Sequence, residues 1–220
     1  MKSRKTWTLF AVTSLFSLLC FSISYQAYTQ DEKSQQPYSQ GVRQTLSFHW
    51  YSGPEEKIPV SDRHKIPLRQ SLERIVMETT QTDIQVRTHS EKAVHTDYVG
   101  NILWRDQDKT HLTSVTKTHI EKQSNILTIG IDPAPGVKFR SQATLTVRIP
   151  KEFANKVIVK TVSGDVEVQN LALREVTVSS TSGDLKIQDL KTERLDGHST
   201  SGNFEVSASQ ITDTRLRSVS

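Results

Sequence analysis

From residue 157 onward, this 220-residue chain repeats one 19-residue unit three times and begins a fourth. Each complete unit carries Ser-Gly-Asp or Ser-Gly-Asn, and the serines of these triplets, Ser163, Ser182 and Ser201, are 19 residues apart. A strict period near 20 residues is typical of units that stack and bury their apolar faces on one another. The repeat therefore predicts a stacked architecture and argues against an ordinary compact active site.

Within each unit, apolar and polar residues alternate on both sides of the Ser-Gly triplet, which predicts two short strands joined by a tight bend. Val157, Val176 and Leu195 would then form one buried column, because they hold the same position in successive units. We expect glycine at the bend to supply a positive φ angle, the following Asp or Asn to bind local amides, and the serines to form a hydroxyl column. The expected bend residues are Ser163, Gly164, Asp165, Ser182, Gly183, Asp184, Ser201, Gly202 and Asn203.

Two further columns favour stacking in register. Outward-facing Glu167, Lys186 and Glu205 alternate in charge, so that vertical neighbours attract one another. In the third unit, Gly197 stands where the first two units have valine, and Phe204 stands where they have Val or Leu. We expect the ring of Phe204 to fill the space that the missing valine leaves.

The fold class predicted from these patterns is all-β, because strand-forming residues are abundant and helical periodicity is scarce. We expect a β-solenoid, similar to a parallel β-helix, with 19-residue rungs over residues 157–220 and an irregular N-terminal β part over residues 67–156. In the latter part, residues 83–86 resemble the second strand of a repeat, although the glycine is missing. Residues 111–120 and 126–131 predict a β-hairpin, and residues 143–149 predict a half-buried strand that stops at Pro150.

The N-terminus predicts export. Lys2, Arg4 and Lys5 precede an apolar run, so residues 1–24 are expected to form a hydrophobic helix that serves as a signal peptide or a signal-anchor. Residues 25–66 are expected to be a polar stalk or linker with an aromatic patch, Phe48-His49-Trp50-Tyr51. The single cysteine, Cys20, lies in the apolar run and excludes an intramolecular disulfide.

Charge and motifs argue against several function classes. The net charge is only +4, and the chain has no basic stripe with interleaved aromatic residues, so we expect no nucleic-acid partner. The seven histidines are scattered without a pair at metal-ligand spacing, and no Gly-x-Ser-x-Gly motif is present. Calcium binding by Asp165 and Asp184 is the alternative to a role in bend geometry, which we prefer. We therefore expect no catalytic residues, no cofactor and no metal.

The pattern Ile/Val-x-Val-x-Thr-x-Ser-Gly-Asp-Val-x-Val, preceded by Asp83-Ile84-Gln85-Val86 and by a strand ending in Ile149-Pro150, resembles the bacterial putative-adhesin domain family, whose function is unknown. The resemblance covers residues 70–220. It implies an exported or membrane-attached protein with a right-handed β-solenoid domain and without a catalytic residue set.

The function expected from these features is that of a non-enzymatic, exported cell-envelope protein, an adhesin or scaffold that presents a β-solenoid surface. One alternative is a polysaccharide-binding or lyase-like β-helix protein, and another is an accessory or sensor subunit of an envelope-stress system. The expected location is the cell envelope: membrane-anchored, periplasmic or on the cell surface. Expected partners are an envelope component or glycan, the membrane if the N-terminal helix is retained, and a second copy pairing through the C-terminal edge, unless the natural product continues past Ser220.

Overall fold

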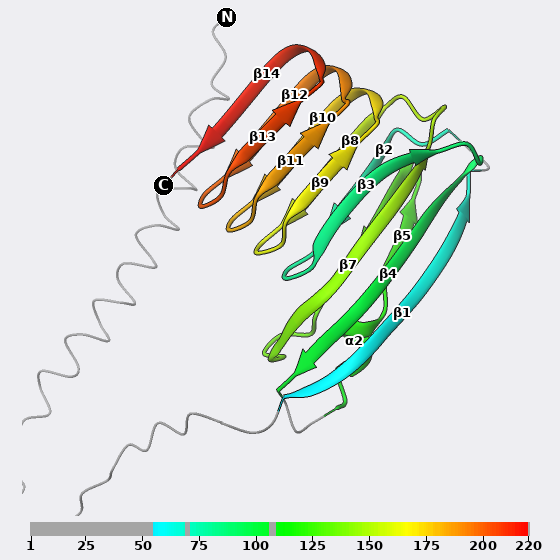
Figure 1. Cartoon of the computed structure of the whole chain (residues 1–220). Coiled ribbons are helices and arrows are strands. Elements are labelled where there is room, and N and C mark those ends of the chain that lie inside the picture. Colours follow the sequence, from blue (N-terminus) through cyan, green and yellow to red (C-terminus); the bar gives the residue numbers. More distant parts are fainter. Residues whose placement is uncertain (1–54, 69–70, 106–108, 220) are drawn as a thin grey trace, which may run out of the picture. The chain divides into compact units, whose positions relative to one another are not determined.

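A computed structural model describes residues 55–68, 71–105 and 109–219 (Figure 1). The predicted export helix, the aromatic patch and most of the predicted stalk lie outside these residues. The described part is mostly β, with two sheets of seven strands each. No helix within it is long and apolar enough to cross a membrane.

The first sheet runs in the order β1 (Glu56–Pro67), β4 (Ala93–Trp104), β7 (Phe139–Pro150), β3 (Asp83–His89), β9 (Val166–Gln169), β11 (Leu185–Gln188) and β13 (Phe204–Ser207). The second sheet runs in the order β14 (Gln210–Ser218), β12 (Lys191–Ser199), β10 (Ala172–Ser180), β8 (Lys156–Thr161), β2 (Arg74–Glu78), β6 (Ile126–Gly130) and β5 (His119–Gln123). Pairing is parallel except for β1 with β4, β4 with β7 and β5 with β6.

Each 19-residue unit contributes one strand to each sheet, and we call such a strand pair a rung. The columns expected from the sequence are confirmed: Val176 pairs with Val157 on one side and with Leu195 on the other. Leu185 likewise pairs with Val166 and Phe204. The rungs therefore lie in parallel register at an offset of one repeat, as Figure 1 shows for β8 to β14.

Two more rungs belong to the part of the chain expected to be irregular. The strand pair β2 and β3 stacks directly on β8 and β9, which confirms that residues 83–86 are a copy of the repeat. The strand pair β6 and β7 stacks on the other side of β2 and β3. Along the chain, β2 and β3 therefore come first, although β6 and β7 stack outside them. After β7 the chain returns past β2 and β3 and begins β8 on their other side.

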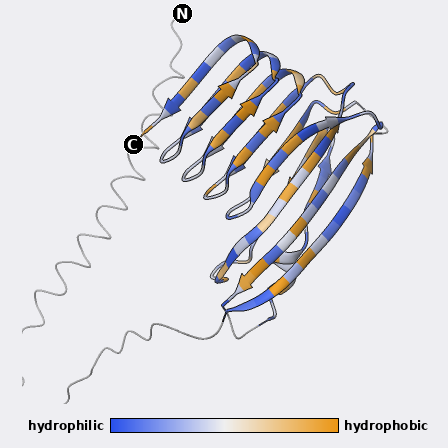
Figure 2. Cartoon of the chain, in the orientation of Figure 1, coloured by the Kyte–Doolittle hydropathy of each residue, from blue (hydrophilic) through white to orange (hydrophobic). Residues whose placement is uncertain are grey.

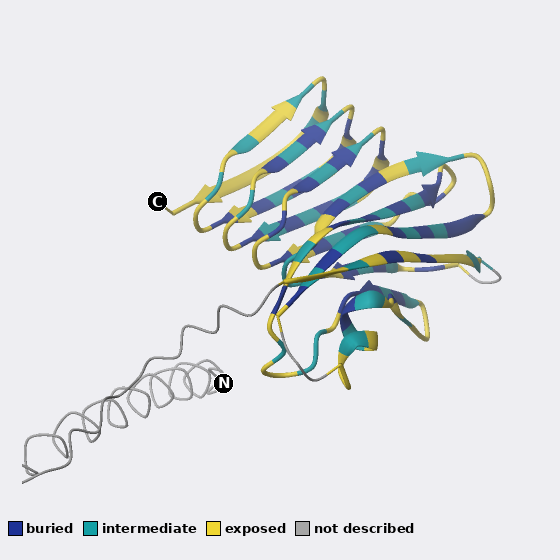
Figure 3. Ribbon diagram, turned by 60° about the horizontal axis from the view of Figure 1, so that its bottom comes forward, coloured by how far each residue is buried: buried dark blue, intermediate teal, exposed yellow. Residues whose placement is uncertain are grey.

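One hydrophobic core lies between the two sheets and continues through the rungs. Apolar and polar residues alternate along the strands of the stack, and burial follows the same alternation (Figures 2 and 3). Val159, Val168, Val178 and Ile187 are fully buried, whereas the intervening residues face outward. The alternation in the sequence therefore predicts correctly which side chains are buried in the core.

Two predictions about the N-terminal half need correction. Residues 56–66 are not a linker, because they form most of β1, a long edge strand whose Val60 is buried. The predicted hairpin is confirmed only for β5 and β6, since Leu112–Thr116 is a short helix, α2. Val115 of this helix is fully buried and its carbonyl accepts a hydrogen bond of 3.0 Å from the Tyr98 hydroxyl, so tertiary packing overrides the strand preference of Val and Thr.

Candidate functional site

The predicted bend residues stack in one column along the edge of the stack. The amide of Asp184 donates a 2.9 Å hydrogen bond to Oδ1 of Asp165, and the amide of Asn203 donates one of 2.9 Å to Oδ1 of Asp184. The same bond, at 3.0 Å, links the amide of Asp165 to Asp83 in the preceding rung. Each carboxylate therefore holds the next rung in register, whereas the sequence led us to expect bonds to amides of the same bend.

The expected reason for glycine at these bends is wrong. Among the described glycines, only Gly100 and Gly136 have positive φ, so Gly164, Gly183 and Gly202 do not supply it. Instead, a Cβ atom on Gly183 would lie closer than 3.0 Å to the carbonyl oxygen of Gly164, and one on Gly202 would meet Gly183 in the same way. Glycine is required because adjacent bends approach each other so closely that a side chain does not fit between them.

The same geometry explains why Thr82 can take the glycine position in its rung. In the rung on its other side, residues 131–138 connect β6 to β7 by a longer path instead of a Ser-Gly bend. The hydroxyl of Thr82 lies 3.2 Å from that of Ser141 near the start of β7, so the side chain has both room and a partner. The copy of the repeat at β2 and β3 can therefore lack the glycine because the neighbouring rung has no bend at that position.

The hydroxyl column predicted for Ser163, Ser182 and Ser201 is exposed, and a second, buried column lies inside the bends. It contains Thr79, Thr161, Ser180 and Ser199. The hydroxyl of Thr79 lies 3.1 Å from that of Thr161, which in turn accepts a 3.2 Å hydrogen bond from the amide of Gly164. These residues were not predicted from the sequence, although Thr or Ser recurs two positions before each triplet serine.

Positive φ occurs at the second bend of each unit, at Asn170 (56°), Asp189 (52°) and Ala208 (49°). Asn and Asp tolerate this left-handed conformation better than other residues with a side chain, whereas alanine does not. The third unit therefore carries local strain at Ala208 that the first two avoid.

We expect Ala208→Asn to raise the free energy of unfolding by about 0.5–1 kcal/mol, because it relieves part of the left-handed penalty of about 1–2 kcal/mol. Chemical denaturation monitored by circular dichroism would measure the change. The matched control is Ala172→Asn, at an exposed alanine without positive φ, where we expect no gain. An equal gain at both sites would contradict the explanation.

The last rung is more exposed than the others. Val206 and Leu216 are 37% and 41% exposed, although the equivalent residues of inner rungs are fully buried. A Cβ atom on Gly197 would lie 2.7 Å from Cε1 of Phe204 and 2.6 Å from Cδ2 of Leu216. Phe204 therefore fills the vacated space, as predicted, and it shares that space with Leu216 of the next strand.

The outward charge column forms in part: Glu167, Lys186 and Glu205 lie in register, but the ion pairs among the described residues are Lys186 with Glu205 and Glu167 with a residue outside the predicted column. Lys186 pairs with Glu205 at 3.9 Å, and Glu167 pairs at 3.5 Å with Arg87 of β3, which the sequence analysis did not include. These side chains are partly exposed, so each pair contributes well under about 1 kcal/mol. These ion pairs help to align neighbouring rungs, and this alignment is sufficient to explain the charged residues of the column.

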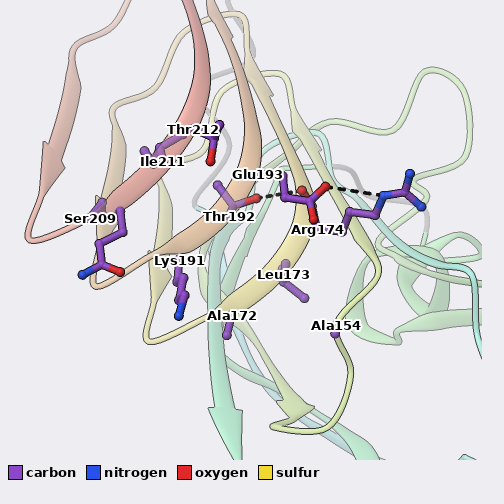
Figure 4. A pocket seen from close by; sticks show the side chains of 11 residues that line it. Ala154, Ala172, Leu173, Arg174, Lys191, Thr192, Glu193, Ser209, Ile211 and Thr212 are labelled. Atoms are coloured by element: carbon purple, nitrogen blue, oxygen red, sulfur yellow. Dashed lines mark hydrogen bonds and ion pairs between the residues drawn. The ribbon is translucent and has the colours of Figure 1, made fainter.

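A groove of about 820 Å³ lies beside the second bends, where β10, β12 and β14 begin (Figure 4). Arg174 and Glu193 form an ion pair of 3.7 Å across it, and the hydroxyl of Thr192 donates to the carbonyl oxygen of Arg174 at 3.1 Å. Lys191 and Gln210 add polar side chains, and none of the residues that line the groove is aromatic. The groove can bind polar or anionic groups but offers no ring on which a sugar could stack.

One group of potential metal ligands converges in the described residues: His89, Glu91 and His95. One donor atom from each lies within 4.8 Å of the others. Burial lowers the pKa of His95 despite the opposing charge of Glu91, and the hydrogen bond and charge of Lys65 lower the pKa of Glu91. This cluster could not be predicted from the sequence, because the spacing of its residues matches no standard metal motif. The available signal was two histidines and a carboxylate flanking one turn.

Asp62 is a buried carboxylate, 7% exposed, with a strongly shifted pKa. Burial by itself raises its pKa, but hydrogen bonds from the Thr118 amide and from His64 outweigh that effect and lower the pKa to about 2. The bond from the Thr118 amide fastens β1 to the segment after α2. A shifted pKa can indicate a catalytic group, but here structural pairing explains it fully.

Stacked 19-residue rungs that form two parallel-rich sheets define a repeat protein in which each unit contacts mainly its neighbours. The chain belongs to the Toastrack DUF4097 family, whose model matches residues 72–220. This match confirms the family resemblance that the Ser-Gly-Asp repeats indicate. No curated protein matches the chain.

Several solved bacterial structures are similar to the chain. A putative cell adhesion protein from Clostridium sporogenes is 8% identical, with a TM-score of 0.45, and the match covers 72% of this chain and all of that one. A putative adhesin from Bacteroides fragilis is 17% identical, with a TM-score of 0.45, and the match covers 75% and 78% of the two chains. A putative adhesin from Parabacteroides distasonis is 10% identical, with a TM-score of 0.36 and coverage of 74% and 79%. At these values the likeness assigns no function.

Proposed function

We propose that this protein is a non-enzymatic, exported component of the cell envelope, an adhesin or scaffold, and that its domain is a β-solenoid that binds through the open end of the stack. The stacking of two-stranded units at a constant 19-residue offset supports the solenoid classification. The charged and apolar run at the N-terminus supports export, with the membrane or the cell surface as the site of action.

The observation that carries the proposal is the contrast between the two ends of the stack. At one end, the edge strand β1 carries Pro59 and Pro67 together with exposed charged residues, and β5 exposes Glu121 and Lys122. Proline and charge on edge strands are the devices by which proteins prevent further strand pairing. This end is therefore protected against association.

The other end combines features that favour association. Within the described residues, the strands β13 and β14 each pair on one side only, and the exposed residues Val206, Leu216 and Val219 lie on or beside them. Unpaired strand edges next to apolar side chains form a surface to which another β-structure can add. A second copy of this chain is the partner we propose, because two identical open ends can pair about a two-fold axis without leaving an edge.

We expect Leu216→Lys to abolish self-association, because it places a charge in the apolar end of the stack. Sedimentation velocity over a wide concentration range should show the wild-type chain moving from monomer to dimer, while the variant stays monomeric. The control is Val99→Lys on β4, which alters a residue of similar exposure, 43%, far from the open end in the strand order.

A wild-type chain that remains monomeric at every concentration would contradict self-pairing. Retention of one envelope protein on immobilised wild-type chain, lost in Leu216→Lys and kept in Val99→Lys, would assign the open end to a different partner. Equal retention by all three proteins would exclude the open end as the binding surface.

The groove in Figure 4 favours a second candidate, the binding of an acidic polysaccharide. Arg174 and Lys191 could pair with sugar carboxylates, and Arg174 can do so in a bidentate manner. A glycan array that includes uronic acids, probed with wild-type chain and with Arg174→Gln, would test it. Binding that Arg174→Gln does not weaken would reject the groove as the site.

A further inference from the structure

The turn between β3 and β4 brings two histidines and one glutamate together on the outer face of the first sheet. β3 and β4 are not neighbours, since β7 lies between them, and the turn at residues 90–92 crosses the end of β7. In register, His89 lies beside Pro150 and His95 beside Arg148, so both histidines lie next to the last residues of β7. The two rings meet edge to face, with their centroids 4.7 Å apart.

Each of the two imidazoles has a nitrogen atom that can act as a ligand, for a different reason. Nε2 of His89 lies 2.7 Å from the carbonyl oxygen of Ala93, so this nitrogen carries the proton and Nδ1 keeps a free lone pair. A backbone carbonyl that fixes the tautomer of a histidine in this way is typical of metal sites. Nε2 of His95 is buried without a hydrogen bond, 3.3 Å from Oε2 of Glu91. When this nitrogen carries no proton, its lone pair is available to an ion that lies between the ring and the carboxylate.

We propose that His89, Glu91 and His95 form a binding site for a divalent transition metal, with Zn²⁺ as the ion that the ligand set suits best. Two imidazoles and one carboxylate are a common three-residue set for zinc with a fourth position open. Tetrahedral bonds of about 2.0–2.1 Å need donor atoms about 3.4 Å apart, closer than the 4.8 Å limit of the present cluster. Glu91 is exposed in a short turn, so a rotation of its side chain can supply this closure.

The competing cation is Lys65, whose Nζ lies 2.6 Å from Oε2 of Glu91. Its side chain is 62% exposed, so it can move into solvent when a metal takes the carboxylate. Arg148 also lies near the cluster, but it forms its ion pair with Asp97, so Lys65 is the cation that pairs with Glu91. A bound ion would join the end of β3 to the start of β4 across the end of β7.

The test is isothermal titration of ZnCl₂ into the purified full chain, prepared without a polyhistidine tag. We expect one ion per chain, and about tenfold or greater loss of affinity in both His89→Gln and Glu91→Gln. Lys65→Gln should bind zinc more tightly than the wild type, because the competing ammonium is gone. Substitution with Co²⁺ should give the visible absorption of a four-coordinate ion in the wild type and not in Glu91→Gln.

The matched control is His198→Gln, which removes an exposed histidine in β12, far from the cluster in the strand order. It should bind zinc like the wild type. Absence of one-to-one binding in the wild type would overturn the proposal, and so would unchanged binding in Glu91→Gln or an equal loss in His198→Gln. Far-ultraviolet circular dichroism of each variant separates a lost ligand from a lost fold.

Discussion

Gly183→Ala should lower the free energy of unfolding by about 3 kcal/mol or more, although it adds only one methyl group at a bend near the surface. The new Cβ atom would collide with the carbonyl oxygen of Gly164 in the preceding rung. The position of a Cβ atom is fixed by the backbone and its contact partner is a backbone oxygen, so no side-chain rotation relieves the overlap and the rungs themselves must separate. The register bond between the amide of Asp184 and Oδ1 of Asp165 would be lost with them.

Urea denaturation followed by circular dichroism would measure this effect as a lower transition midpoint. The matched control is Ser182→Ala, one residue earlier on the exposed side of the same bend, which should stay within about 0.5 kcal/mol of the wild type. If Gly183→Ala were as stable as Ser182→Ala, close approach of the bends would not be the reason for glycine.

Ile187→Ala should cost about 2–5 kcal/mol, the range for truncating a large aliphatic side chain in a packed core. Ile187 is fully buried, with Val168 and Val206 beside it in the neighbouring rungs. Rungs on both sides hold the backbone in place, so the cavity cannot collapse easily. The loss should therefore include a cavity contribution in addition to the lost burial.

The control is Val206→Ala, at the same position one rung later. Val206 is 37% exposed, so its truncation should cost less than about 1 kcal/mol. Equal losses at the two positions, measured by the same denaturation experiment, would mean that the open end is covered in solution. In that case, sedimentation of the same samples would show whether a second copy covers it.

The two proposed sites lie on different parts of the molecule and can be tested independently. The open end depends on β13 and β14, whereas the histidine cluster belongs to the β3–β4 turn. Failure of zinc binding leaves the interaction surface untouched, and a monomeric protein leaves the metal site untouched. If both proposals hold, a metal ion stabilises the β3–β4 turn of the first sheet, and a separate binding surface lies at the open end of the stack.

The amino-acid sequence by itself determined the repeat, its register and the inward columns. This was possible because strand alternation and a constant 19-residue period are local properties: Val157, Val176 and Leu195 must align once the period is known. The same logic predicted that Phe204 compensates for Gly197. It also identified residues 83–86 as a copy of the repeat, because the copy keeps the alternation even without the glycine.

Tertiary structure alone decided three things. It placed the rung of β6 and β7 outside that of β2 and β3, since parallel pairing depends on which edges are free and not on chain order. It showed that Gly164, Gly183 and Gly202 are required by a neighbouring backbone, because the contact involves residues 19 or more positions away. It also brought His89 and His95 together across the end of β7, through a turn whose path depends on a strand that comes more than 40 residues later in the sequence.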